Sequence, residues 1–204
     1  MKILILFAHP AFERSRVHAR LLKAVRTLPG ITLRDLYEEY PDFDVLPGQE
    51  QPILEKHDLI IFQHPFYWYS GPALLKQWMD LVLEHGWAYG KDGVALQGKY
   101  LMQVISTGGN AQAYTAEGHH GHAVHDFLLP YRQSALLCHM HYLPPYIVPG
   151  SAHIADEDLA RYADGFVQLL QGLSNNSIDL KMLMRQPEAN MLTGLPGLLP
   201  APPR

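Results

Sequence analysis

The chain has 204 residues, 48% of them hydrophobic, which is enough to fill one core and too little for two full-sized domains. Sixteen basic and twenty acidic residues give a formal net charge of -4 without a long basic run, which argues against nucleic acid as a partner. One cysteine, Cys138, fits a reducing compartment, and the apolar run at residues 3–8 is too short for a membrane span or a signal peptide. We therefore expect a cytoplasmic protein.

Short apolar runs alternate with longer helical patterns along residues 1–173. Residues 2–7 are aliphatic without polar alternation, which is typical of a strand buried on both faces of a parallel sheet. Further strands are predicted at residues 31–36, 59–63, 100–105 and 142–148, and helices at residues 16–28, 52–56, 72–82, 124–137 and 156–170. Parallel neighbours need crossover connections, so this alternation predicts a three-layer α/β fold. Its doubly wound sheet has five parallel strands in the order 2-1-3-4-5.

The chain changes in character at residue 174. Residues 174–204 begin with a polar stretch and contain five prolines, so they cannot form one regular element throughout. A short helix is expected at residues 178–184. We predict a flexible or surface-draped extension, and the alternative is an arm that packs on a second subunit, because several leucines remain in it.

Three segments follow the carboxyl ends of strands one, three and four, where a doubly wound sheet gathers its ligands. The first, residues 8–16, lacks a Gly-x-Gly-x-x-Gly run, which argues against a dinucleotide site. It offers the hydroxyl of Ser15 at a helix N-terminus, an arrangement that suits a phosphate monoester. The alternative role for Ser15 is that of a plain N-cap. Cationic or donor side chains near it are His9, Arg14, Arg16 and His18.

The second segment, residues 64–72, holds four consecutive aromatic residues at positions 66–69. Flat apolar side chains pack against planar ring systems, although they could also form a plug that covers the sheet. Trp87 and Tyr89 lie beyond the next predicted helix, and we expect them to line the same pocket.

The third segment, Thr107-Gly108-Gly109, ends a predicted strand and exposes backbone N–H groups that could meet the carbonyls and ring nitrogens of a flavin. Tyr114 and the pair His119-His120 follow it as candidate acid–base groups. The three segments together describe a site for a phosphorylated, planar, heteroaromatic cofactor. FMN fits better than NAD, which would need a glycine-rich pyrophosphate turn.

Four histidines near the third segment raise the alternative of a metal site. No cysteine or paired carboxylate joins them at helical ligand spacing, and Asp126 alone is a weak partner. We therefore predict no metal. The four are His119, His120, His122 and His125.

Several segments within residues 1–173 carry a resemblance to a known family through their order and spacing. They are Ala8-His9-Pro10 with Ser15, Gln63-His64-Pro65 with Trp68-Tyr69-Ser70, His85-Gly86-Trp87-Ala88-Tyr89-Gly90, Thr107-Gly108-Gly109 and Leu143-Pro144-Pro145. With these segments the chain resembles the flavodoxin-like NAD(P)H:quinone oxidoreductase family, which includes DT-diaphorase. Within that family it is most similar to the ancillary subunits of glutathione-regulated potassium-efflux systems.

The resemblance implies an activity and its partners. These are bound FMN, NADH or NADPH as hydride donor, a quinone substrate, a ping-pong cycle, and a homodimer with sites at the subunit interface. It also implies an alternative role, in which the protein binds a potassium-efflux antiporter at the inner face of the membrane and activates it.

The resemblance also assigns site residues by position. Tyr114 and His120 match the pair that stabilises charge on the flavin as hydride arrives. His18 stands where family members usually have asparagine, and the adjacent His119 leaves the choice of histidine open; we prefer His120 for its spacing to Tyr114. The implied cofactor-binding residues are His9, Ser15, Arg16, Val17 and His18 on the phosphate side, Pro65, Phe66, Tyr67 and Trp68 beside the ring, and Ser106, Thr107, Gly108 and Gly109 at its polar edge.

Overall fold

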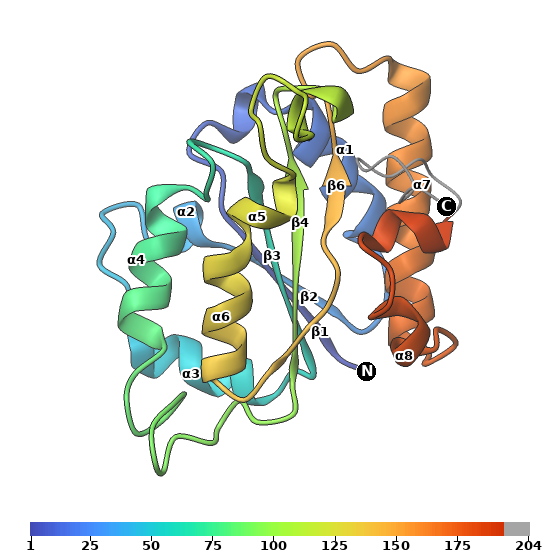
Figure 1. Ribbon diagram of the computed structural model, residues 1–204. Helices are drawn as coiled ribbons and strands as arrows, with labels where there is room; N and C mark the ends of the chain where they lie inside the picture. Colours follow the sequence, from blue (N-terminus) through green and yellow to red (C-terminus); the bar gives the residue numbers. More distant parts are fainter. Residues whose placement is uncertain (194–204) are drawn as a thin grey trace.

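All strands of the central sheet run parallel (Figure 1). The computed structural model describes residues 1–193. The strand order is β2-β1-β3-β4-β5, with β6 also paired to β4, which confirms the predicted order. The strands are β1 (Ile3–Phe7), β2 (Ile31–Asp35), β3 (Leu59–Pro65), β4 (Tyr100–Ser106), β5 (His141–Tyr142) and β6 (Tyr146–Val148).

The fifth strand differs from its prediction as one element over residues 142–148. Two short strands take its place, with Leu101 opposite Tyr142 and Val104 opposite Tyr146 on β4. Pro144 and Pro145 lie between them, and proline has no N–H group for a ladder hydrogen bond. The edge of the sheet is therefore interrupted where these two residues stand.

Helices connect the strands and cover both faces of the sheet (Figure 1). The helix predicted at residues 124–137 is divided at Leu128, and the one predicted at residues 52–56 begins earlier, at Pro47, a residue suited to a first helical turn. The α-helices are α1 (Arg16–Val25), α2 (Leu36–Glu39), α3 (Pro47–Glu55), α4 (Ala73–Val82), α5 (Val124–Phe127), α6 (Leu129–Leu137), α7 (Asp156–Ser174) and α8 (Leu180–Leu183). Short 3-10 helices are η1 (Phe12–Arg14), η2 (Ala111–Tyr114) and η3 (Ala189–Thr193).

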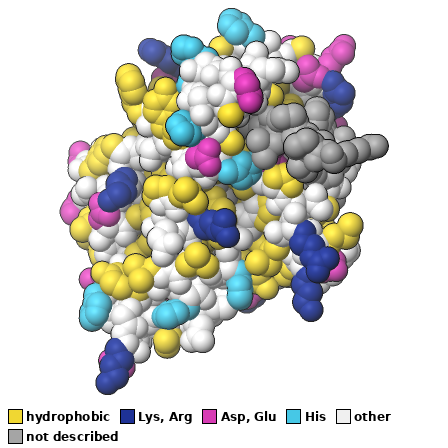
Figure 2. Space-filling view, in the orientation of Figure 1, with side chains coloured by type: hydrophobic (Ala, Val, Ile, Leu, Met, Phe, Trp, Pro, Cys, Tyr) yellow, Lys and Arg dark blue, Asp and Glu magenta, His cyan; other side chains and the backbone are white. Residues whose placement is uncertain are grey.

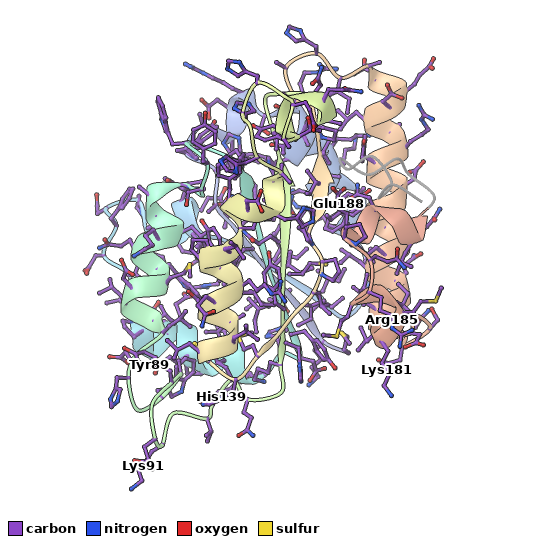
Figure 3. All side chains as sticks on the ribbon, in the orientation of Figure 1. Tyr89, Lys91, His139, Lys181, Arg185 and Glu188 are labelled. Atoms are coloured by element: carbon purple, nitrogen blue, oxygen red, sulfur yellow. The ribbon has the colours of Figure 1, made fainter. Side chains whose placement is uncertain are left out.

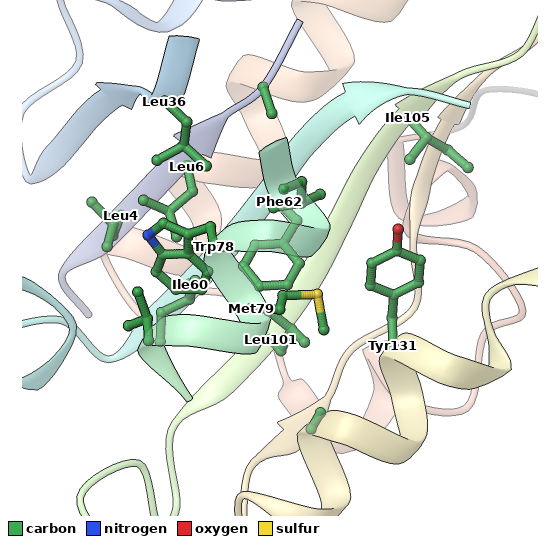
Figure 4. Packing of buried hydrophobic residues seen from close by; sticks show 14 of the residues in the cluster. Leu4, Leu6, Leu36, Ile60, Phe62, Trp78, Met79, Leu101, Ile105 and Tyr131 are labelled. Carbon is green, nitrogen blue, oxygen red and sulfur yellow. The ribbon is translucent and has the colours of Figure 1, made fainter. Parts of the chain in front are cut away.

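The side chains of β1 alternate between two apolar cores, one on each face of the sheet. Leu4 and Leu6 belong to one core together with Trp78 of α4 and Tyr131 of α6, and Figure 4 shows the two leucines on the Trp78 side of this core. The odd-numbered residues of β1 belong to the second core, which α1 and α7 cover. Burial on both faces explains why β1 is apolar at every position. None of the helices in the described part of the chain is both long and apolar enough to cross a membrane.

The described part of the tail is anchored to its own subunit. The side-chain amide of Asn190 donates to the carbonyl of Ile147 at 2.9 Å and accepts from its N–H at 2.8 Å. The N–H of Ala189 donates to the carbonyl of Pro145 at 2.9 Å. The part of the tail within residues 174–193 is thus held at the open edge of β6 by Ala189 and Asn190 instead of draping loosely over the surface. The helix predicted at residues 178–184 is shorter, at Leu180–Leu183, and the prolines beyond residue 193 lie outside the described residues.

Candidate functional site

The three predicted site segments meet at the carboxyl edge of the sheet. Parallel pairing brings the end of β1 beside β3 and places Pro65 of β3 opposite Ser106 of β4. The ring of His9 lies 6.0 Å from the ring of Tyr67, which joins the first segment to the second. The His18 ring contacts Ser106 at 3.0 Å, which joins the first to the third. Figure 2 shows histidine side chains at this upper end of the molecule.

The first segment presents hydrogen-bond donors at the start of α1. The Ser15 hydroxyl accepts from the N–H of His18 at 3.1 Å and so caps the helix. The N–H groups of Arg16 and Val17 make no hydrogen bond with the described part of the chain. Free N–H groups and the helix dipole together favour an anion at this position.

His9 adds a further donor beside these N–H groups. Burial lowers the pKa of His9, although Glu13 opposes the change. The Nδ1 atom of the neutral ring accepts from the N–H of Ala11 at 3.1 Å. The proton of this ring therefore stands on Nε2, which can donate a hydrogen bond to a ligand.

The side chains of two residues predicted on the phosphate side, Arg16 and His18, make other contacts in the structure. The guanidinium of Arg16 forms an ion pair with Asp156 at the start of α7, at 2.6 Å. Only the backbone N–H of Arg16 therefore remains available to a ligand at the first turn of α1. His18 is fully buried, and burial holds its pKa well below the usual value. Its side chain is therefore neither a cation nor a direct phosphate ligand, and it lies beneath the site.

The aromatic segment divides into a buried and an exposed part. Phe66 is buried against Tyr114 and Phe127, while Trp68 has 92% of its surface exposed. Trp68 and Tyr69 have φ angles of 50° and 61°, in the left-handed region that bulky residues avoid. Such a conformation costs free energy, so the surrounding structure holds the loop in a shape that the chain alone does not favour.

The glycine segment has a defined conformation and an open face. The Thr107 hydroxyl donates to the carbonyl of Gly109 at 2.8 Å, which fixes the turn. The N–H groups of Gly108 and Gly109 make no hydrogen bond within residues 1–193, and a Cβ on Gly108 would meet open space. These N–H groups are thus available to oxygen and nitrogen acceptors of a ligand.

Tyr114 and His120 form a stacked pair beside this segment. Their ring centroids lie 4.2 Å apart with an angle of 24° between the planes. A Cβ on Gly109 would come within 3.1 Å of the Tyr114 ring and 3.4 Å of His120 Nε2, so glycine allows this close approach. Burial raises the pKa of Tyr114, which keeps its hydroxyl protonated and able to donate. His119 is exposed, so the geometry favours His120 for the catalytic role that the sequence predicts.

Tyr69 was not among the predicted site residues, although it stands in the aromatic run that pointed to the site. Its hydroxyl lies 3.3 Å from His120 Nδ1, and its ring stacks on Phe127 at 4.9 Å. Tyr69 therefore links the aromatic segment to the candidate catalytic pair. The sequence showed that aromatic residues cluster here but did not show which of them turns toward His120.

Trp87 and Tyr89 do not line this pocket within their own subunit, so that prediction is wrong. The Trp87 indole donates to Glu55 at the end of α3 at 3.0 Å, near the amino ends of the strands. Figure 3 shows Tyr89 and Lys91 at the lower end of the molecule, away from the site loops. The cause is the direction of α4, which runs from the carboxyl edge of the sheet to the opposite edge.

The metal alternative receives no support from the described residues. Within residues 1–193, no three His, Cys, Asp or Glu side chains are arranged to hold a metal ion. His122 lies 3.8 Å from Asp126, and the Nε2 atom of His125 contacts the carbonyl of Pro187 at 2.5 Å.

Comparison with known proteins gives one family match. Residues 1–170 match the family described as having the flavodoxin-like fold. The potassium-efflux system ancillary protein KefG of Yersinia enterocolitica is 44% identical over 170 residues, which cover 83% of this chain and 92% of that protein.

Two solved structures with similar sequences share the fold. General stress protein 14 of Treponema denticola, in complex with FMN, has a TM-score of 0.81 and 37% identity, over 85% of this chain and 99% of that one. An NADPH-quinone reductase of P. pentosaceus has a TM-score of 0.75 and 34% identity, over 82% of this chain and 96% of that one.

Proposed function

Because the chain belongs to the family with the flavodoxin-like fold, we propose that it is an FMN-dependent NAD(P)H:quinone oxidoreductase. One observation carries the proposal: three loops that offer anion donors, an aromatic surface and free backbone N–H groups converge on one edge of the sheet. The relative in complex with FMN and the relative named as a quinone reductase support it.

The residues present fit FMN. The start of α1, with Ser15, the N–H groups of Arg16 and Val17, and His9 Nε2, would hold the phosphate. Tyr67 and Trp68 would border the ring, and the N–H groups after Thr107 would meet its polar edge. Pro65 and Phe66 are buried and would support the ring from below, whereas His18 would act only from beneath the site.

When bound, FMN supplies the two-electron chemistry, in which a hydride comes from NADH or NADPH and then reduces a quinone in a ping-pong cycle. Overall, NAD(P)H, a proton and the quinone give NAD(P)⁺ and the hydroquinone. The protein's task is to stabilise the negative charge that hydride transfer brings to the site. The Tyr114 hydroxyl and the His120 ring offer hydrogen-bond donors for that purpose, and Tyr69 orients His120.

The proposal is tested by the visible spectrum and one assay. We expect the purified protein to show flavin absorbance and to oxidise NADH or NADPH only when a quinone is added. A colourless protein that stays inactive after addition of FMN would contradict the proposal.

The two adjacent histidines provide a matched pair of variants. We expect His120→Ala to lower kcat about a hundredfold, because one charge-stabilising donor is lost, while FMN affinity changes less. His119→Ala, whose side chain is exposed, should retain kcat within about twofold. Steady-state kinetics and FMN titration check both. Unchanged turnover in His120→Ala would assign the role to His119 or to water.

A second candidate function rests on the similarity to KefG, which is named as an ancillary protein of a potassium-efflux system. The chain would then bind an antiporter at the inner face of the membrane as a homodimer, with quinone reduction as a secondary activity. Co-purification with the antiporter and measurement of potassium efflux test this role. Quinone turnover without association or any effect on efflux would contradict it, and a monomer in sedimentation would contradict the dimer.

A further inference from the structure

A chain of hydrogen bonds runs from the interior to the candidate site through a histidine. The Gln63 side-chain amide lies 3.4 Å from His18 Nδ1, and His18 Nε2 lies 3.0 Å from the Ser106 hydroxyl. Gln63 and His18 are fully buried, and Ser106 retains only 6% of its surface at the end of β4. This series of hydrogen bonds therefore ends at the Ser106 hydroxyl, next to the segment that starts at Thr107.

The direction of these hydrogen bonds follows from which atom of the Gln63 amide faces the His18 ring. Gln63 Oε1 is buried without a hydrogen-bond partner in the described residues. The nitrogen of the amide is the atom that faces His18 Nδ1, and an amide nitrogen can donate a hydrogen bond but cannot accept one. The amide therefore donates to His18 Nδ1. Since burial keeps the ring neutral, its single proton stands on Nε2 and is donated to Ser106.

Ser106 is left with a hydrogen that no described residue accepts. Its oxygen accepts a hydrogen bond from His18 Nε2–H, and no other hydrogen bond to this hydroxyl occurs within residues 1–193. We propose that His18 is a positioning residue, which uses its Nε2–H to turn the Ser106 hydroxyl hydrogen toward the bound cofactor. This inference rests on the proposed FMN function.

A second buried histidine shows what a purely structural arrangement looks like. His64 Nδ1 donates to the carbonyl of Pro65 at 2.9 Å, and Nε2 accepts from Gln103 at 3.1 Å. The Tyr142 hydroxyl in turn donates to Gln103 at 2.6 Å. Both ends of this chain close on protein atoms. The chain through His18 instead stops at a hydroxyl with an unused donor, and this difference points to a ligand.

Two substitutions at position 18 separate the two hydrogen bonds of the ring. A glutamine amide reaches as far as Nε2 and can still donate to Ser106, so His18→Gln preserves the contact. An asparagine amide reaches only as far as Nδ1, so His18→Asn retains a partner for Gln63 and loses Ser106. Ser106→Ala removes the hydroxyl itself, and the double variant His18→Asn with Ser106→Ala completes a cycle.

The test is a titration of each apoprotein with FMN, in which the quenching of flavin fluorescence measures binding. We expect His18→Asn and Ser106→Ala each to weaken FMN binding about threefold to tenfold, the loss of one neutral hydrogen bond. His18→Gln should stay within about twofold of the wild type, and the double variant within about twofold of Ser106→Ala. Losses that multiply in the double variant, or equal losses in both position-18 variants, would overturn the proposal.

A measurement on the apoprotein keeps the inference separate from the proposed function. Imidazole ¹⁵N NMR should show His18 in the Nε2–H form. An Nδ1–H form would overturn the proposal even where a variant does not fold. A wild-type protein that binds no FMN would contradict the proposed function, and with it any role of Ser106 toward that cofactor.

Discussion

Ser15 has two roles at the level of the single residue, and substitution can separate them. It caps α1, and its hydroxyl lies among the donors proposed for the phosphate. Asparagine and aspartate cap helices as well as serine does, so both variants should keep the melting temperature within about 2 °C. The negative charge of Ser15→Asp would repel the phosphate and weaken FMN binding more than about tenfold, whereas Ser15→Asn should weaken it about threefold at most.

Thermal unfolding of the apoprotein and FMN titration at low and high salt measure these effects. The charge effect of Ser15→Asp should shrink as salt rises, because ions screen the repulsion. Equal FMN affinities for the two variants would place the phosphate elsewhere.

Trp68 combines almost full exposure with a left-handed backbone conformation. Trp68→Gly and Trp68→Ala both remove the indole, but only glycine adopts this conformation without steric cost. We expect the glycine variant to be more stable than the alanine variant by about 1 kcal/mol, measured by urea unfolding. Both should bind FMN more weakly than the wild type. An alanine variant as stable as the glycine variant would show that the backbone is not strained.

At the scale of the element, Asn190 holds the described part of the tail on the edge of the sheet. Asn190→Ala would leave the N–H and carbonyl of Ile147 without their side-chain partner in a buried position. We expect a loss of about 2 kcal/mol in the free energy of unfolding. Lys181→Ala, an exposed change in the same tail, should cost less than about 0.5 kcal/mol. Equal stability of the two variants in urea unfolding would show that the tail is not anchored through Asn190.

The sequence predicts elements whose signals are local. Apolar runs such as residues 59–63 gave the strand positions, and their alternation with helices gave the sheet order. Pro144 and Pro145 divide the last strand, although the pattern of residues 142–148 predicted one continuous strand. The anchoring of Asn190 on Ile147 could not be predicted, because a contact across 43 residues leaves no local pattern.

For the candidate site, sequence order predicted which loops meet, because parallel strands bring their carboxyl ends together. It did not predict the depth of each side chain. His18 and Arg16 are polar residues near a helix start, and nothing in that position distinguishes a buried ring from a phosphate ligand. Their neighbours Ser106 and Asp156 lie 88 and 140 residues away in the chain.

At the scale of the whole molecule, buried histidines make stability depend on pH. Burial lowers the pKa values of His9 and His18, and it lowers that of His64 to about 4. The unfolded chain binds protons at these rings near pH 6.5, whereas the folded chain does not. Stability is therefore full above pH 6.5 and falls as the pH drops toward the folded-state values.

For His64 alone, the fall of the pKa from 6.5 to about 4 on folding lowers the free energy of unfolding by about 2 kcal/mol between pH 8 and pH 5. His64→Gln cannot be protonated, so its free energy of unfolding should fall by about 2 kcal/mol less over this range. Urea unfolding of the apoprotein at both pH values measures the difference, and His119→Gln, at an exposed position, is the control. An unchanged pH dependence in His64→Gln would contradict the low pKa of His64.

The three tryptophans of the chain occupy different environments, which has a spectroscopic consequence. Trp78 is 1% exposed in the core, Trp87 is partly buried at the far end, and Trp68 is 92% exposed beside the candidate site. Water shifts the emission of an exposed indole to longer wavelengths, so the red edge of the spectrum comes mainly from Trp68. A cofactor or second subunit that covers this loop should therefore shift that edge to shorter wavelengths, and the protein carries its own optical reporter at the site.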